Sequence, residues 1–531
     1  MTEGWGPLDR LVGQADALAG AWGARARAST TIGQERAILR LFGVSGLDAA
    51  GRPLAGSTVD RWLAGHSPGL GGGIALPFAM GLLEYDLDPQ QLALDVASGA
   101  VDLALEAALL REPDRRAVAE AEANRLAVAA VERIDAERTA RHETIAMLGD
   151  ASRPWLGATL RQPDEDAALE EAGALIDAGL DLIRIEVPIG RELAARLTAA
   201  GHDVPEWHPR AGARGALGRE LADPAPIGSQ RALAMLRRAV DRAGAERQSY
   251  VRLATVVPAL GAPEGAVVAA FERIDLIASD AMAEIVADGV EPDRALADHA
   301  FAHRLASRAG TSIVVGPGPL VVAPDLSAGQ PSDPGTRAGR ALALQLIGVA
   351  LARGDGLPDN QIVLGALPSW ITDEPAPAAR AIAEVAVRRA LFPKHPFAFV
   401  EPPMGQTGSA LWPYVQAAAA VHAGDLALVM RQYNPWADDD RGAVQELRAG
   451  SLVAAEAAAA APPGQLAGLA LEHARSMIGA AVATLEQLAD RGWRAVAGDG
   501  PGGGRALRGR DAVAERTEAF DPFEAFFGRR A

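Results

Sequence analysis

Cysteine is absent from this chain of 531 residues, and lysine occurs once, as Lys394. Without cysteine there are no disulfides, no thiolate nucleophiles and no cysteine metal sites. Schiff-base catalysis, including that of pyridoxal phosphate (PLP) enzymes, needs a lysine amine, and within this chain only Lys394 offers one. Arginine supplies the other basic residues, as biased codon usage would produce, but this bias does not explain why Lys394 remains.

A basic charge balance and a long apolar run are also missing. The net charge of −17 argues against nucleic acid or an anionic membrane as the main partner. Apolar runs such as 457–461 are alanine-rich and too short to span a bilayer. The first residues lack the basic and then apolar segments of a signal peptide. We therefore expect a cytoplasmic protein, and a hydrophobic share of 49% is ample for a large core.

Two flanking regions have a helical pattern. Residues 1–150 are predicted to form a mainly helical accessory region, because Leu8–Ala28 and 115–147 carry apolar residues at helical spacing. Turn-rich stretches lie between them, and no strand alternation is obvious there. Residues 441–531 are predicted to form C-terminal helices and a tail, with helix over 440–495. The aromatic residues of 520–527 are expected to pack back on the body.

Residues 151–440 alternate short apolar runs with amphipathic stretches, and strands that alternate with helices indicate a parallel sheet. Eight such units suit a (βα)8 barrel. The fold class is therefore predicted to be α/β, a (βα)8 TIM-type barrel with helical N-terminal and C-terminal additions. An open, doubly wound sheet is the structural alternative. The predicted strands are 155–160, 182–187, 250–257, 276–279, 312–315, 361–364, 397–400 and 426–430, and the helices between them include 164–178, 230–243, 337–352, 376–391 and 409–423.

Reactive groups of a parallel barrel gather at the C-terminal ends of its strands. Glu186 and Glu192 flank the second predicted strand end, where two carboxylates could perform acid–base chemistry. Glu192 also opens a predicted helix, where negative charge is favoured in any case. Gln432 follows the eighth strand and is a third catalytic candidate. Ordinary βα turns would have the same composition.

Cofactor-binding candidates lie after the last two predicted strands. Gln406, Thr407 and Gly408 precede a predicted helix, where backbone N–H groups could hold an anion such as phosphate. A turn with Thr407 near a helix N-cap is the simpler interpretation. Asn434 is the corresponding candidate after the eighth strand.

His299 and His303 are four residues apart, which places both rings on one helix face, as a helical zinc site requires. No third ligand is evident, and the glutamate of an HExxH motif is missing. We therefore predict two ordinary histidines and no metal site.

Several motifs match one known pattern and are collinear over nearly the whole chain. The segment Phe392–Gly408 is similar to FPKAPLKYMPPTK.MTG, and Thr31–Asp48 is similar to TVTVERAVCRLLGIDGVD. The remaining matches are short: Ser249–Leu253 with RYIRL, Phe271–Asp275 with LERLD, Arg294 and Asp298 with R…VD, and Phe520–Phe523 with a terminal NPF. With these motifs the chain resembles the α subunit of lysine 5,6-aminomutase, also called D-lysine or β-lysine aminomutase.

The resemblance implies an adenosylcobalamin- and PLP-dependent isomerase that moves a terminal amino group of a small-molecule substrate by one carbon. In that family the α subunit is a barrel that grips PLP, and a separate β-type subunit binds cobalamin and supplies the aldimine lysine. Hetero-oligomer formation is therefore expected. This chain has no DxHxxG motif of its own for binding cobalamin.

The family's PLP contacts are missing from the aligned positions of this divergent member, so PLP binding is doubtful. The phosphate-binding arginine aligns with Val187, and a carboxylate at Glu192 replaces a phosphate-binding serine. The other departures are a serine that aligns with Pro258, a ring-packing tyrosine with Ala283, an acidic residue with Gly318 and a lysine with Gly405.

Three functions remain open. The chain could be an aminomutase subunit that holds PLP through other groups. It could be the barrel subunit of a PLP-independent adenosylcobalamin isomerase. It could also be a non-catalytic paralogue that binds a partner or a corrinoid. The resemblance places Lys394 before the seventh barrel strand, away from the mouth, so any PLP aldimine must come from another chain.

Overall fold

The fold is given by a computed structural model of the whole chain. It describes residues 8–50, 52–64, 69–151, 153, 155–160, 165–185, 230–288, 290–316, 333–365, 377–400, 426–431, 468–495, 513–517 and 520–528.

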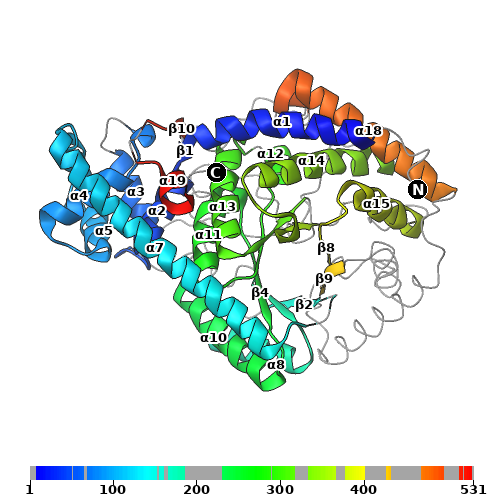
Figure 1. Ribbon diagram of the computed structural model, residues 1–531, viewed down its shortest axis with the longest axis horizontal. Coiled ribbons are helices and arrows are strands. Elements are labelled where there is room, and N and C mark those ends of the chain that lie inside the picture. Colours follow the sequence, from blue (N-terminus) through cyan, green and yellow to red (C-terminus); the bar gives the residue numbers. More distant parts are fainter. Residues whose placement is uncertain are drawn as a thin grey trace.

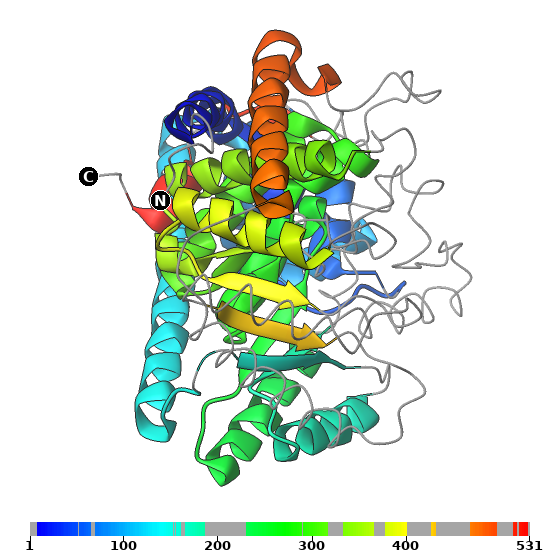
Figure 2. The ribbon, with the colours of Figure 1, turned by 90° about the vertical axis from the view of Figure 1, so that its right-hand side faces the viewer.

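Eight parallel strands form a closed barrel, in which β2 pairs with both β3 and β9. Figure 2 shows β2, β8 and β9 side by side with their arrows in one direction. The predicted barrel is therefore confirmed, and the open-sheet alternative is wrong. The strands are β2 (Trp155–Thr159), β3 (Leu182–Ile185), β4 (Arg252–Val256), β5 (Leu276–Ala278), β6 (Ser312–Val315), β7 (Ile362–Leu364), β8 (Phe397–Val400) and β9 (Leu426–Arg431).

Helices lie outside this barrel and connect its strands (Figure 1). Four of the five predicted crossover helices are confirmed, and the fifth, 409–423, lies outside the described residues. The helices are α8 (Glu165–Asp177), α10 (Gln230–Arg247), α11 (Ala262–Phe271), α12 (Ala281–Asp288), α13 (Pro292–Ala309), α14 (Pro334–Gly354) and α15 (Pro377–Leu391), with short 3₁₀ turns η4 (Ala259–Gly261) and η5 (Asp359–Gln361).

The N-terminal region is helical, as predicted. In Figure 1, α1 lies across α13 and α14, and α7 runs from the group formed by α2 to α5 towards α8 and α10. Thr31 caps α2, because its Oγ1 accepts a hydrogen bond from the Gln34 N–H at 3.0 Å. The elements are α1 (Leu8–Ala28), α2 (Ile32–Leu41), α3 (Leu54–Ala64), η1 (Leu70–Gly72), α4 (Ala75–Tyr85), α5 (Pro89–Ser98), α6 (Leu103–Leu109) and α7 (Pro113–Leu148).

The C-terminal part returns to the N-terminal helices. Strand β10 (Val513–Glu515) pairs antiparallel with β1 (Ser29–Thr31), so a short strand exists where the sequence indicated none. Helix α18 (Leu469–Arg491), followed by the turn η7 (Gly492–Ala495), lies beside α1 and α14. Within the predicted helical stretch 440–495, residues 440–467 lie outside the described part. The region boundaries near 150 and 440 stay predictions.

The predicted packing of the C-terminal aromatic residues is confirmed. Phe523, Phe526 and Phe527 belong to the short helix α19 (Pro522–Phe527), and Phe520 directly precedes its N-cap residue. Phe526 is fully buried, and its ring centroid lies 6.2 Å from that of Phe42 on the C-terminal side of α2. The ring centroid of Phe523 lies 5.9 Å from that of Phe301 on α13, in an edge-to-face arrangement.

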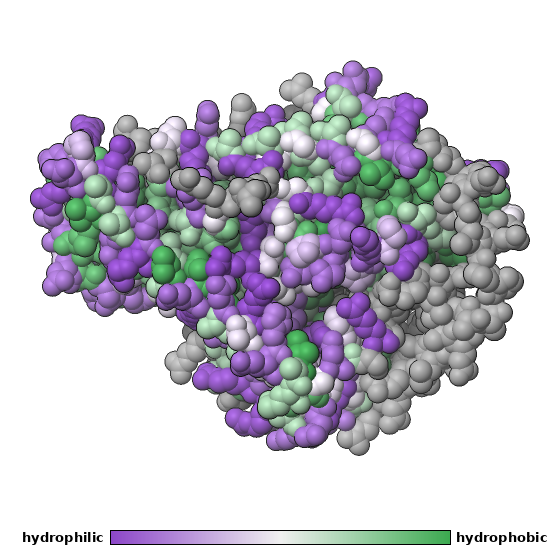
Figure 3. All heavy atoms as spheres, in the orientation of Figure 1, coloured by the Kyte–Doolittle hydropathy of each residue, from purple (hydrophilic) through white to green (hydrophobic). Residues whose placement is uncertain are grey.

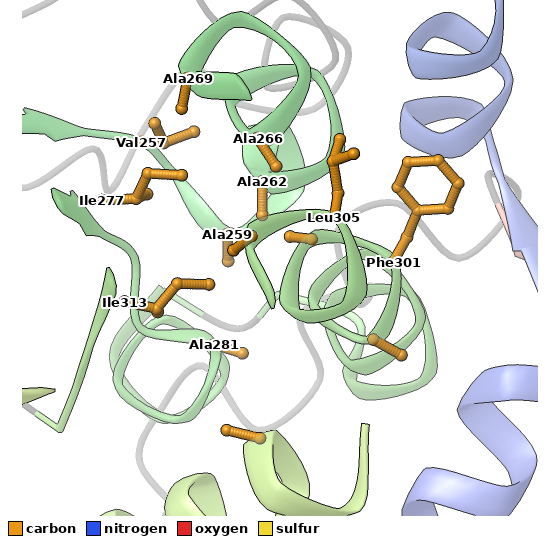
Figure 4. Packing of buried hydrophobic residues seen from close by; sticks show 14 of the residues in the cluster. Val257, Ala259, Ala262, Ala266, Ala269, Ile277, Ala281, Phe301, Leu305 and Ile313 are labelled. Atoms are coloured by element: carbon orange, nitrogen blue, oxygen red, sulfur yellow. The ribbon is translucent and has the colours of Figure 1, made fainter. Parts of the chain in front are cut away.

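Small side chains bring the helices close to the barrel wall. Figure 4 shows Ala262, Ala266 and Ala269 of α11 between the strand residues and Leu305 of α13. Strand residues alternate between this outer layer and the barrel lumen, because successive side chains point to opposite faces. The buried lumen residues are Leu182, Ala254, Leu276, Ala278, Val314, Val363 and Ala398.

The surface in Figure 3 is mostly hydrophilic over the N-terminal helices, with separate hydrophobic side chains among them. Leu105 of α6 is an exposed hydrophobic residue of this region, with 64% of its surface exposed. Within the described ranges, none of the helices combines the length and the apolar character that a membrane crossing needs.

Lys394 is exposed in the turn that enters β8, at the N-terminal ends of the barrel strands and therefore opposite the mouth. Because arginine keeps the positive charge that acts on nearby Asp359, we expect Lys394→Arg to change the free energy of unfolding by less than about 0.5 kcal/mol. Urea denaturation of the two proteins measures this difference. A loss of cofactor-dependent activity in the folded variant would show instead that the amine is functional.

Candidate functional site

The mouth of the barrel lies where the parallel strands end. Strand β3 ends at Ile185 and β9 at Arg431, directly before the candidates Glu186 and Gln432. All seven sequence-predicted candidates lie outside the described residues, so their roles stay predictions. They are Glu186, Glu192, Gln406, Thr407, Gly408, Gln432 and Asn434.

An arginine that the sequence analysis missed lies inside the lumen near the mouth. Arg184 is two residues after the lumen residue Leu182 on β3, so it shares the inward face. Only 2% of its surface is exposed. Its Nε donates to the Thr159 hydroxyl at 2.7 Å, and the two residues are register partners on neighbouring strands. This pair places a fixed positive charge in the lumen near the mouth of the barrel.

Small side chains accompany Arg184 in the lumen. Ala254, Ala278 and Ala398 belong to the same inward-facing cluster. Because Arg184 is buried and charge interactions are stronger away from water, an anionic group that reaches its guanidinium would be bound more strongly than by a surface arginine.

The opposite end of the lumen is closed by a stacked pair. The Arg252 guanidinium of β4 lies 3.5 Å from the ring centroid of Trp155 on β2. Arg252 also forms an ion pair with Asp150. These contacts fix a second arginine at the N-terminal ends of the strands. Side chains at this end of such barrels usually serve stability rather than catalysis.

A buried serine–histidine pair follows β5. The Ser279 hydroxyl lies 3.1 Å from His299 Nε2, and His299 Nδ1 lies 3.0 Å from the Ala295 carbonyl oxygen. A carbonyl only accepts, so Nδ1 carries the proton and Nε2 accepts from Ser279. Burial, with the charge of nearby His303, lowers the pKa of His299 to about 4. The imidazole is therefore neutral at pH 7.

The second histidine has a carboxylate partner. His303 Nδ1 lies 3.0 Å from Asp355 Oδ2, and the other oxygen of Asp355 accepts from Arg27 of α1 at 3.0 Å. The two histidines do share one helix face, as their spacing predicted, with ring centroids 5.7 Å apart. Each is engaged by protein groups, and the described residues include no cluster of three or more His, Asp or Glu suited to a metal ion.

Side-chain donors hold the ends of β6 and β7. Gln345 of α14 donates its Nε2 to the carbonyl oxygens of Val315 at 2.9 Å and Gly365 at 3.1 Å. Arg388 of α15 donates to the same Gly365 oxygen. Gly316 has a φ of +104°, and a Cβ there would lie 2.1 Å from Gln345 Nε2, so only glycine fits. The backbone at this edge of the mouth is therefore rigidly placed.

The comparisons with known proteins agree on one relationship. The sequence model described as the D-lysine 5,6-aminomutase TIM-barrel domain of the alpha subunit matches residues 9–424. The lysine 5,6-aminomutase alpha subunit of Acetoanaerobium sticklandii is 26% identical over 73% of this chain and 69% of that protein. The corresponding subunit of Fusobacterium nucleatum is 25% identical over 74% of this chain and 70% of that protein.

A solved structure of dihydropteroate synthase from Anaplasma phagocytophilum is also similar. It has 13% sequence identity and a TM-score of 0.36, and the alignment covers 56% of this chain and 97% of that one. This likeness is too weak to support an inference about chemistry.

Proposed function

The chain belongs to the family of the D-lysine 5,6-aminomutase α subunit barrel, and from this membership we propose that it is the barrel subunit of an adenosylcobalamin-dependent isomerase. A separate cobalamin-binding subunit is its proposed partner, because the α subunit relatives are named as one part of an assembly and this chain lacks a DxHxxG motif. The observation that carries the proposal is the closed barrel with Arg184 in its lumen near the mouth.

The residues at the family's PLP contact positions do not fit PLP. Pro258, two residues after β4, has no hydroxyl to donate to a phosphate, and Ala283 on α12 is a buried methyl group that offers no ring to a pyridine. Glu192 would repel a phosphate dianion. Lys394 lies at the other end of the barrel. We therefore assign no catalytic step to PLP in this chain.

Arg184 and Thr159 are proposed to hold the anionic end of a small substrate, such as an amino-acid carboxylate. Adenosylcobalamin, when bound by the partner subunit, would supply radical chemistry, and this chain would bind and orient the substrate and exclude water. A guanidinium whose Nε is already fixed by Thr159 needs little reorganisation when a carboxylate arrives, which favours binding.

Two alternatives make different predictions. If PLP is held by other groups, the assembled complex should develop the visible absorbance of an aldimine when PLP is added. If the chain is a non-catalytic paralogue, it should bind a partner or a corrinoid and leave the cobalt–carbon bond intact with every substrate offered.

Co-purification of the chain with a cobalamin-binding protein encoded beside it tests the proposal. The complex is mixed without oxygen with adenosylcobalamin and a panel of diamino and monoamino acids, with PLP absent, and the spectrum is followed. We expect a substrate-dependent change from the alkylcobalamin spectrum to that of cob(II)alamin. Failure to form a complex, or an unchanged spectrum with the full panel, contradicts the proposal.

Arg184→Gln is expected to lower the rate of substrate-dependent cobalt–carbon cleavage by about 10- to 100-fold at subsaturating substrate. One charge-assisted hydrogen bond contributes about 1.5–3 kcal/mol, and glutamine cannot replace the charge. The matched control is Arg125→Gln, which removes an exposed arginine on α7. An unchanged rate in a folded Arg184→Gln protein would remove Arg184 from the substrate site.

A further inference from the structure

A small pocket lies just outside the barrel wall, behind the end of β5. Its volume is about 20 Å³, and α1, α12, α13 and α14 surround it. The polar side chains that line it are Ser279, Asp280, His299, His303 and Asp355. The remainder of the lining is apolar or glycine, for example Met282, Leu296 and Gly348.

Asp280 brings an unsatisfied carboxylate oxygen to this space. Its Oδ1 accepts from the Ala283 N–H at 3.1 Å and so caps α12. Its Oδ2 is buried and has no hydrogen-bond partner among the described residues. Burial raises the pKa of Asp280 to about 6, which reflects the cost of removing the carboxylate from water. A buried oxygen of this kind normally has a partner.

His303 brings a second polar atom to the same space. Because Asp355 accepts from Nδ1, the other ring nitrogen, Nε2, is left for another partner, and the described residues provide none. His299 differs, since Ser279 and the Ala295 carbonyl engage both of its ring nitrogens. The lining therefore holds two polar atoms that lack protein partners, Asp280 Oδ2 and His303 Nε2.

We propose that this space is a binding site for a single water molecule that bridges the Asp280 carboxylate and the His303 imidazole. A cavity needs roughly 10–15 Å³ to admit one water, and a polar cavity of this kind is normally hydrated whereas an apolar one stays dry. Water also suits the two atoms chemically, because it can donate to the carboxylate oxygen while it donates to or accepts from the imidazole nitrogen.

A divalent metal ion fits the site less well. Magnesium and calcium ions take about six or more oxygen ligands, whereas this lining offers one free carboxylate oxygen and one imidazole nitrogen. Asp355 is already neutralised by Arg27 at 3.0 Å. The site therefore provides the two to four hydrogen-bonding groups that a buried water needs, and too few ligands for a metal ion.

The bridging water has a structural consequence. It completes a hydrogen-bonded path from Asp280, at the end of β5, through His303 and Asp355 to Arg27 of α1. The N-terminal helix is thereby connected to one strand end at the mouth, across the width of the helical layer.

A crystal structure that resolves ordered solvent tests the site directly in the unmodified protein. We expect one peak within hydrogen-bonding distance of both Asp280 and His303. Crystals soaked in rubidium chloride should show no anomalous signal there. An empty cavity, a peak that contacts only one of the two residues, or a rubidium signal would overturn the proposal.

A double-mutant cycle tests the bridge in solution. Asp280→Asn keeps an oxygen that can cap α12, and His303→Asn keeps a donor near Nδ1 but leaves nothing at Nε2. Because the water links the two residues, their effects on the unfolding equilibrium constant should deviate from additivity by about fivefold, within the range for coupled neighbours. Asp280→Asn combined with Glu272→Gln, on the turn after α11, is the additive control. Additivity in both cycles contradicts the bridge, and the result does not depend on catalytic activity.

Discussion

Phe526→Ala is expected to lower the free energy of unfolding by about 3–5 kcal/mol, the usual range for removing a buried aromatic ring. Phe526 is fully buried and lies between Phe42 and Phe520, with ring centroids 6.2 and 6.3 Å away. The loss has two sources, the transfer of the ring from the core and the cavity that remains. Urea or thermal unfolding measures it.

The control for this variant is Leu469→Ala, at a leucine of α18 with 62% of its surface exposed. We expect a change within about 0.5 kcal/mol there. If Phe526→Ala is equally mild, then α19 does not contribute to the stability of the body. A selective loss of α19, with the barrel intact, would appear as early protease cleavage near residue 520 without a shift of the main unfolding transition.

Glu264→Ala is expected to have an effect of similar size. Glu264 of α11 accepts from Arg40 Nε of α2 at 2.7 Å, and both side chains are at most 2% exposed. Removal of one partner of a buried ion pair typically costs about 3–5 kcal/mol, because the guanidinium loses the carboxylate that accepts from its Nε. The free energy of unfolding, measured at constant pH and salt, gives the value.

An exposed ion pair provides the comparison. Glu84 of α4 and Arg115 of α7 are separated by 3.0 Å, and each has more than 40% of its side chain exposed. Glu84→Ala should cost less than about 1 kcal/mol, because water screens such pairs. Equal effects of Glu84→Ala and Glu264→Ala would mean that the α2–α11 pair is not specially important for holding the N-terminal helices on the barrel.

The barrel could be predicted from the sequence because its signals are local. Each strand is a short apolar run, and helices of ordinary length separate the runs. Leu8–Ala28 was predicted with both ends correct, since its alanine and leucine pattern breaks at Ser29. Strand β1 was missed because it has three residues and its stability depends on partners at 513–515. No local pattern reveals a pairing over such a distance.

The site was less predictable. Arg184 stands in the run Leu-Ile-Arg-Ile, and a sequence does not tell which face of that strand points into the lumen. A charged residue inside an otherwise apolar barrel strand is the signal that could have identified it. The spacing of His299 and His303 showed that they share a face, whereas Ser279 and Asp355 are 20 and 52 residues away from their partners. Only the tertiary fold brings these groups together.

The pairing of β1 with β10 can form only late in synthesis, because its two strands lie near opposite ends of the chain. Ser29 meets Glu515, which follows it by 515 − 29 = 486 residues. At about 5–20 residues per second, a ribosome needs roughly 25 to 100 seconds to cover that interval. Throughout it, the surface of Phe42 that later receives α19 lacks its aromatic cover, and the surface of Phe301 lacks it from the moment that residue is made. The nascent N-terminal helices are therefore candidates for chaperone binding until the last part of the chain emerges.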